Sequence, residues 1–420
     1  MKHFILFFSF FLVTNLFSKE WYEEDDELEF SVEEVDYKKP FQAIVVDPNF
    51  SPFAGGYDIL FFHHLLTKGE DYLLRNKNKD RPGAAWYRFF EIFLFWDLLD
   101  NMLSVTQHEV FGHGYRLRDE GENVQGYMVS PWAGWTRFDP NESTFKTGEL
   151  MAVNIAGLEA EFILARLAKM NWIRSGRIDG RLSALYNQAQ QSLFWYTIIT
   201  HMGELKGDAV SGNDVEAYLN LLNLSYPNDQ INIGTLTTWA AFNWLDPMTF
   251  YSYFSMFYYI ATGKPWEFPM IPIKENIRYL PNARIGYAPY GPEAYFENFF
   301  SIDGNPLYVY FKGGKRSAGA GFSYNYFLEN ERVTLGANLD VWNQGKFITD
   351  ATVEDIIEKR PIFRPELLEK QWGVAASLTS TVKIKSYMGL FVELGGKTQG
   401  YLPGYSLDKG VVARVGLVFQ

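Results

Sequence analysis

The spacing of apolar residues changes once along this chain, and that change limits the folds open to it. From Ala84 to about Pro265, apolar residues recur every third or fourth position, the spacing of one face of an α-helix. Beyond Leu280 they alternate with polar residues, as between Val333 and Val341, and period two is typical of strands with one apolar face. The sequence therefore predicts an α+β fold, in which a mainly helical region precedes an antiparallel β-region.

The helical region contains several separate elements. A short extended pair is expected around Pro131 and Gly134, because these residues favour a turn between two apolar runs. The predicted helices cover 84–112, 150–170, 182–205, 215–222 and 235–260, and the extended pair covers 124–138. We assign 84–265 to one helical domain.

Eight alternating segments make up the β-region, 281–420. They cover 283–290, 294–302, 306–312, 317–328, 331–343, 371–384, 386–396 and 409–419, with one longer excursion at 344–370. Eight antiparallel strands of about ten residues predict a small closed barrel. The pattern resembles the C-terminal half of bacterial outer-membrane β-barrel proteins, which commonly end in a strand with a terminal aromatic; here Phe419 is followed by Gln420. A soluble antiparallel β-domain is the alternative.

The first residues predict export. Lys2 supplies a positive charge, Phe4 to Val13 forms an apolar stretch and Ser18 is a small residue, so 1–18 is typical of a secretory signal peptide. The stretch is shorter than the run of about 20 apolar residues that a membrane-spanning helix needs. The next segment, 19–83, starts with an acidic run typical of a solvated tail. We expect an outer-membrane protein with a periplasmic domain, or a periplasmic protein, with any membrane contact made by the β-region.

The net charge argues against nucleic acid as a partner, and the lack of cysteine excludes metal sites with thiolate ligands. The formal net charge is −12, which argues against nucleic acid, because proteins that bind it carry basic surfaces that neutralise phosphate. The chain has no cysteine, so it forms no disulfide and carries no lipid-modified cysteine. A metal site must therefore be built from His, Asp and Glu side chains.

The segment His108-Glu-Val-Phe-Gly-His-Gly114 is the most informative motif. Zinc needs imidazoles that converge on a point about 2.0–2.1 Å away, and metal-assisted hydrolysis needs a carboxylate beside the reacting water. In a regular α-helix, residues five apart lie about 140° apart around the axis, so His108 and His113 could not bind one ion. One extra residue in a π-bulge brings both to the same face. We therefore predict a π-bulge near Phe111–Gly112 and a metal site at this motif.

The heptad is similar to the H-E-x-x-G-H-G stretch of the dipeptidyl-peptidase III family of zinc exopeptidases. The resemblance implies that His108 and His113 bind zinc and that Glu109 activates water. That family takes a third ligand, a Glu, from a second helix, and the matching region here contains Glu159 and Glu161. Glu159, in Leu-Glu-Ala, also resembles the Asn-Glu-Ala ligand segment of thermolysin-like peptidases, and it is the expected third ligand. Glu161 is an alternative, about 200° away around the helix.

His201 is a further candidate, either as a third ligand or as a donor to the transition state. It lies three residues before Glu204 on an apolar helix, and polar residues follow at 207–214. A capped helix end would account for the same residues without a site. The identity of the third ligand therefore stays open among Glu159, Glu161 and His201.

The expected function is zinc-dependent hydrolysis in the bacterial cell envelope. Peptide bonds are the substrate that the resemblance implies, and an ester or amide of lipid or cell wall is the other option. Zinc would lower the pKa of a bound water toward about 7, and Glu109 would take its proton as general base. The alternatives are a non-catalytic outer-membrane protein with a structural metal or degenerate motif, and an intramembrane metalloprotease. Charged residues between Tyr87 and Val105 argue against the last, because they are costly in lipid.

Overall fold

The fold is described from a computed structural model. It describes residues 38–73, 83–138, 147–206, 213–346 and 369–419, together with Glu358 and Arg360. All of these belong to one compact unit, Asp36–Gln420. The predicted signal peptide, the acidic run and most of the predicted excursion at 344–370 lie outside the described residues.

One continuous helical rod carries the histidine motif. It consists of α3 (Ala84–Glu91), a π-helical turn η1 (Ile92–Trp96), α4 (Asp97–His108), a second π-helical turn η2 (Glu109–His113) and α5 (Gly114–Asp119). The predicted helix is thus confirmed and extends about two turns beyond its predicted end. The second π-helical turn includes Phe111 and Gly112, where the bulge was predicted.

Most other predicted helices are also present. The helices outside the rod are α2 (Pro52–Leu73), α6 (Thr147–Ser175), α7 (Ser183–Lys206), α8 (Asp214–Ser225), α9 (Ile233–Ala240) and α10 (Pro247–Thr262), with short 3₁₀ turns η3 (Gly180–Leu182), η4 (Pro227–Asp229) and η5 (Ala241–Leu245). The single helix predicted over 235–260 is wrong. Pro247 starts a new helix there, and Asp246 caps it by accepting a hydrogen bond from the Met248 amide at 3.1 Å. None of the described helices is both long and apolar enough to span a membrane.

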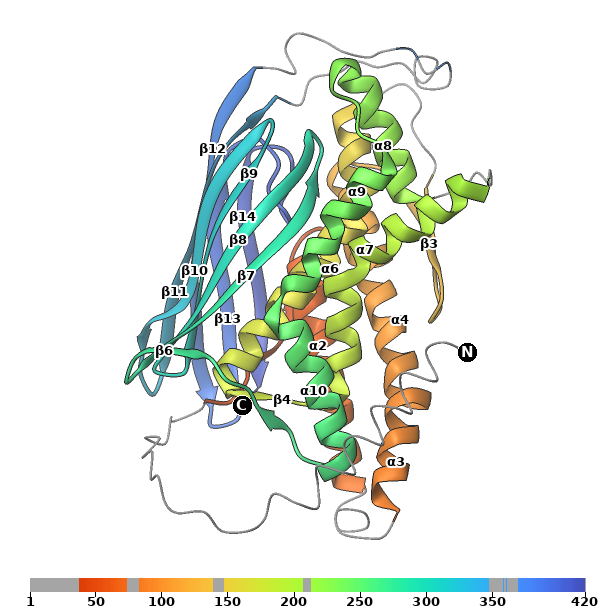
Figure 1. The fold of residues 1–420 in the computed structure, drawn as a ribbon. Coiled ribbons are helices and arrows are strands. Elements are labelled where there is room, and N and C mark those ends of the chain that lie inside the picture. Colours follow the sequence, from red (N-terminus) through yellow and green to blue (C-terminus); the bar gives the residue numbers. More distant parts are fainter. Residues whose placement is uncertain are drawn as a thin grey trace. The chain divides into compact units, whose positions relative to one another are not determined.

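Helix α6 runs through the centre of this unit, between the other helices and the large sheet (Figure 1). Leu164 and Ala168 pack in one apolar cluster with Phe299 and Tyr308 of the sheet. Because α6 contacts neighbours on nearly all sides, it is apolar around most of its circumference. The buried Lys169 ammonium forms an ion pair with Asp246 at 3.1 Å, so this charge is compensated.

The large sheet has ten antiparallel strands in the order β1-β14-β13-β12-β11-β10-β9-β8-β7-β6. Their bounds are β1 (Gln42–Val46), β6 (Ile271–Lys274), β7 (Ile277–Ala288), β8 (Gly291–Ile302), β9 (Asn305–Gly314), β10 (Ser317–Glu329), β11 (Val333–Gly345), β12 (Lys370–Lys385), β13 (Met388–Lys397) and β14 (Gly410–Phe419). All eight predicted strands, β7 to β14, are confirmed. Two small sheets pair β2 (Val124–Val129) with β3 (Gly134–Phe138), as predicted, and β4 (Arg177–Ile178) with β5 (Trp266–Glu267).

The sheet does not close into the predicted eight-stranded barrel. Closure would require β7 to pair with β14, but β6 extends the sheet beyond β7, and β1 extends it beyond β14. The outer edge of β1 is occupied by side chains instead of a strand. The Val45 amide donates to Asp58 Oδ1 at 2.7 Å, and the Asn171 amide bonds both the N–H and the C=O of Phe41 at 3.0 Å. These contacts satisfy edge groups that another strand would otherwise pair.

Candidate metal centre

The π-helical turn brings the two motif histidines to one side of the helical rod. His108 ends α4 and His113 ends the turn, and their Nε2 atoms lie 3.1 Å apart. Gly112 eases the distortion of the helix, and it also allows the π-helical turn to pack closely against α6. A Cβ atom at this position would lie 2.7 Å from the Ala156 carbonyl oxygen and from Gly157 Cα, so only glycine lets the turn approach α6 this closely.

Asp214 completes the cluster, and sequence reasoning did not assign it. Its Oδ2 lies 3.2 Å from Nε2 of both His108 and His113. Asp214 is the first residue of α8, and the preceding Asn213 caps that helix by accepting a hydrogen bond from the Glu216 amide at 2.9 Å. The cap fixes where α8 starts and thereby holds the Asp214 carboxylate over the histidine pair.

The three atoms have the spacing of metal ligands. Their separations are 3.1, 3.2 and 3.2 Å, and two ligands of a tetrahedral zinc at 2.0–2.1 Å lie roughly 3.3–3.4 Å apart. An ion could therefore be held after a small outward shift of each group. Two imidazoles and one carboxylate suit zinc and several other divalent transition ions. The group could thus hold a metal ion, as predicted, although the ligand set differs from the predicted one.

Neighbouring groups orient both imidazoles for binding. The Nδ1 atom of His113 lies 2.7 Å from the Val153 carbonyl oxygen, and Nδ1 of His108 lies 3.1 Å from Oε2 of Glu161. A carbonyl oxygen only accepts, so Nδ1 of His113 carries the proton and its Nε2 lone pair faces the cluster. The Glu161 carboxylate fixes His108 in the same way, as in many carboxylate–histidine–metal arrangements.

The pKa shifts of the cluster favour positive charge at its centre. Burial alone would lower the pKa of His108, but Tyr196, Glu161 and Asp214 raise it well above its usual value. Burial acts the same way on His113, and Asp214 again gives a raised pKa. Burial alone would raise the pKa of Asp214, but the two imidazoles hold it well below its usual range. The pocket therefore stabilises a cation, whether protons or a metal ion.

Glu109 and Tyr196 border the cluster. The buried Glu109 carboxylate accepts a hydrogen bond from the Thr136 hydroxyl of β3 at 2.7 Å, so the β2–β3 hairpin holds this side chain. The Tyr196 hydroxyl of α7 lies 3.3 Å from His108 Nε2, and its ring stacks on the His108 ring at 5.3 Å between centroids. A carboxylate and a hydroxyl thus stand next to the ligand atoms without belonging to the ligand set.

The remaining predicted residues lie apart from the three ligand atoms. Glu159, the expected third ligand, points to the other side of α6, where the Arg116 guanidinium donates to it at 3.0 Å and the Tyr401 hydroxyl at 2.9 Å. Its buried charge is paired there, which explains why it does not face the histidines. Glu161 contacts His108 from outside the cluster, and His201 lies near Gly234 of α9.

Comparisons with known proteins returned nothing similar to this chain: no protein-family model, no curated protein and no solved structure matches it.

Proposed function

We propose that the protein is a metal-dependent hydrolase of the bacterial cell envelope, with zinc as its metal and peptide bonds as its substrate. The observation that carries the proposal is the triangle of His108, His113 and Asp214 with the Glu109 carboxylate beside it. Among the described residues this cluster offers three ligand atoms. Three protein ligands and an open position are typical of catalytic zinc, whereas structural zinc is closed by four.

Each neighbouring group has a role in this proposal. A divalent ion held by the three ligands would supply Lewis acidity, which lowers the pKa of coordinated water toward about 7 and polarises a carbonyl. Glu109 takes the proton of the attacking water as general base. The Tyr196 hydroxyl, 3.3 Å from His108 Nε2, donates to the oxygen that becomes negative in the transition state. We propose peptide bonds as the substrate because the heptad resembles that of zinc exopeptidases. We propose a location in the cell envelope because of the predicted signal peptide.

The first test is the metal content of the purified protein. We expect one zinc per chain, lost in His108→Ala, His113→Ala and Asp214→Ala. Glu216→Gln is the matched control, because this side chain lies on the same helix as Asp214 but makes no contact with the cluster. A folded, unchelated wild type without metal would refute the proposal.

The second test separates catalysis from structural metal binding. Wild type and Glu109→Gln are incubated with peptide, ester and amide libraries, and the products are followed by mass spectrometry. We expect Glu109→Gln to keep its zinc and to lose turnover, because the amide cannot accept the proton. Undiminished turnover in this variant would overturn the assigned role. Full zinc binding with no turnover in the wild type would favour a structural metal.

A further inference from the structure

The large sheet carries its charged residues on the face that packs against the helices. This inward face holds every charged side chain of β8, β9, β11, β13 and β14, namely Glu293, Glu297, Lys312, Asp340, Glu393, Lys397 and Arg414. The charges are paired in place: Lys312 with Glu293 at 3.0 Å and Arg414 with Glu393 at 2.8 Å. In sheets with one face in water, the apolar residues point to the core and the polar residues point outward. Here the charged residues point inward instead, among buried aromatic residues such as Phe299 and Tyr308.

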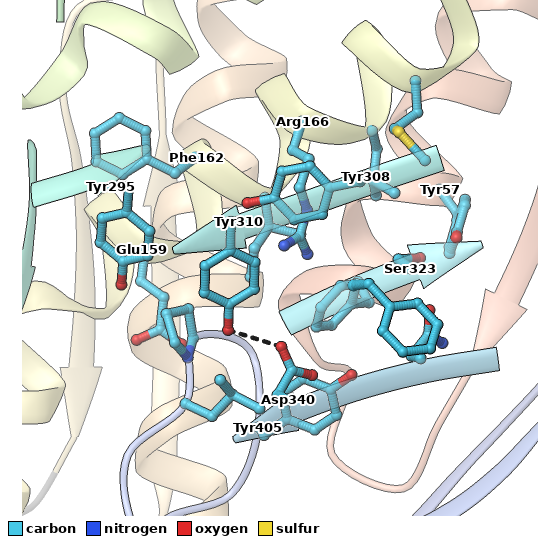
Figure 2. Close-up of a pocket in the computed structure, with 18 of the residues that line it drawn as sticks. Tyr57, Glu159, Phe162, Arg166, Tyr295, Tyr308, Tyr310, Ser323, Asp340 and Tyr405 are labelled. Atoms are coloured by element: carbon cyan, nitrogen blue, oxygen red, sulfur yellow. Dashed lines mark hydrogen bonds between the residues drawn. The ribbon is translucent and has the colours of Figure 1, made fainter. Parts of the chain in front are cut away.

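A cavity of about 120 Å³, lined by both charged and aromatic side chains, lies between α6 and the inward face. Figure 2 shows Arg166 of α6 together with Tyr310 and Asp340 of the sheet around it, and the Tyr310 hydroxyl donates to Asp340 at 2.7 Å. A water needs only about 10–15 Å³ measured in this way, so the space has room for several. The inward face therefore combines paired charges and aromatic side chains with a cavity that is large enough to hold water.

The outward face is apolar and exposed. In register, one row of side chains crosses five strands as Ala413, Leu394, Leu378, Ala337 and Tyr324. Leu378 is 69% exposed and Leu394 is 58% exposed. The described helices all lie on the other side of the sheet in Figure 1, so nothing among them covers this row.

The distribution of charge along β12 sets the height of the apolar surface. Outward positions run from Trp372 to Val382, and Lys370 and Lys385 lie at the two ends of the strand. Ten residue steps at about 3.3 Å give roughly 33 Å, which covers the apolar band of about 25 Å that lipid-exposed strands present. Cationic residues at the ends of such a band are placed to reach lipid phosphates.

We propose that the outward face of the ten-stranded sheet contacts the acyl chains of membrane lipids. The extent of the face argues for lipid over a second protein. Apolar outward positions run from β1 to β8, eight neighbouring strands, so the face measures roughly 38 by 33 Å, or about 1,250 Å². A standard protein interface takes about 800 Å² per partner and has a polar rim. No charged rim interrupts this face between the strand ends.

The test uses single-cysteine variants of the full chain, because the wild type has no cysteine. Leu378→Cys and Leu394→Cys place a nitroxide label on the outward face. Glu331→Cys places it in the exposed turn between β10 and β11, as the aqueous control. Thr379→Cys, next to Leu378 but pointing inward and buried, controls for orientation. The protein is reconstituted into phosphatidylethanolamine–phosphatidylglycerol vesicles, and collision rates are measured with oxygen, which concentrates in the bilayer, and with a water-soluble nickel chelate.

We expect the outward labels to collide at least several-fold more with oxygen than with nickel, and the Glu331 label to show the reverse. The Thr379 label should be shielded from both reagents. Nickel accessibility at Leu378 and Leu394 equal to that at Glu331 would overturn the proposal. So would a monodisperse wild type that neither needs detergent nor sediments with vesicles, or strong spin–spin broadening that reveals a second copy on this face. None of these labels contacts the metal cluster, so this result and the hydrolase tests can fail independently.

Discussion

Replacing Glu161 by glutamine tests the geometry of the metal centre most directly. The substitution keeps the size of the side chain and its contact with His108, 3.1 Å away, but removes a buried negative charge. Two arguments give the expected loss of metal affinity. Loss of such an orienting partner typically weakens metal binding 10–100-fold, or about 1.4–2.7 kcal/mol. A carboxylate roughly 6 Å from the ion, at an effective dielectric constant of about 20, attracts each unit of charge by about 3 kcal/mol.

The assay is competition for zinc between the metal-free protein and a chromophoric chelator at pH 7.5. We expect Glu161→Gln to bind zinc 10–100-fold more weakly than wild type, and Asp214→Asn to lose considerably more, because it removes a direct ligand. Glu159→Gln is the matched control: it removes a buried carboxylate from the same helix, two residues away, on the side that faces Arg116. Its zinc affinity should equal that of wild type wherever the variant is folded.

Two outcomes would refute this reasoning. If Glu161→Gln loses as much affinity as Asp214→Asn, Glu161 is itself a ligand and the described triangle is incomplete. If folded Glu159→Gln loses zinc, the ligand expected from the sequence is the correct one. Circular dichroism of each variant separates both outcomes from unfolding.

Three further results are expected. Gly157→Ala should reduce zinc content, because its Cβ would lie 2.2 Å from His108 Nε2, whereas Gly126→Ala, with no atom within 4 Å, should not; equal content by elemental analysis would contradict this. Both ligand histidines have raised pKa values, so the metal-free fold gains stability below about pH 6.5 and loses it as the pH rises through the folded values. Zinc binding at pH 7 should accordingly release at least one proton, and calorimetry that shows the same heat in buffers of different ionisation enthalpy would argue against it. Arg116→Met should lower the free energy of unfolding by about 3–5 kcal/mol, because it strands the buried Glu159; adding Glu159→Gln should recover part of the loss in urea denaturation, and no recovery would mean that the pair is not coupled.

The parts of the fold that local chemistry determines could be predicted. Two histidines five apart can bind one ion only if the helix gains a residue in that turn, and the π-helical turn over Glu109–His113 is there. The strands β7 to β14 follow from period two, because in each strand a more buried face that points to the helices alternates with a more exposed face. Proline and capping chemistry also account for the helix boundaries at Pro247 and Asn213, although the prediction of one helix over 235–260 missed the first of them.

The parts of the fold and of the site that depend on contacts between residues far apart in the sequence could not be predicted. Asp214 lies 101 residues beyond His113 at the start of a helix, where an aspartate is common for its favourable interaction with the helix dipole alone. The sequence does not distinguish Glu159 from Glu161 as the carboxylate that faces the histidines. In the structure Arg116 pairs with Glu159, which leaves Glu161 to contact His108. The sheet is extended beyond β7 by β6 and beyond β14 by β1, and β1 is a strand of five residues whose partner is far away in the sequence.

That pairing has a consequence for how the molecule forms. Strand β1 precedes all the described helices, yet Gln42–Val46 pairs with Val415–Phe419, so this edge of the sheet is completed only after the described helices and the other strands have been synthesised. Joining segments so far apart carries a large loop-closure entropy, and topologies of this kind fold slowly. During that interval, the hydrogen bonds that the Val45 and Phe41 amides donate to Asp58 of α2 and Asn171 of α6 can already hold this segment. We therefore expect β1 to be bound to the helices before β14 is synthesised, and the pairing of β14 with β1 to be a late step of folding.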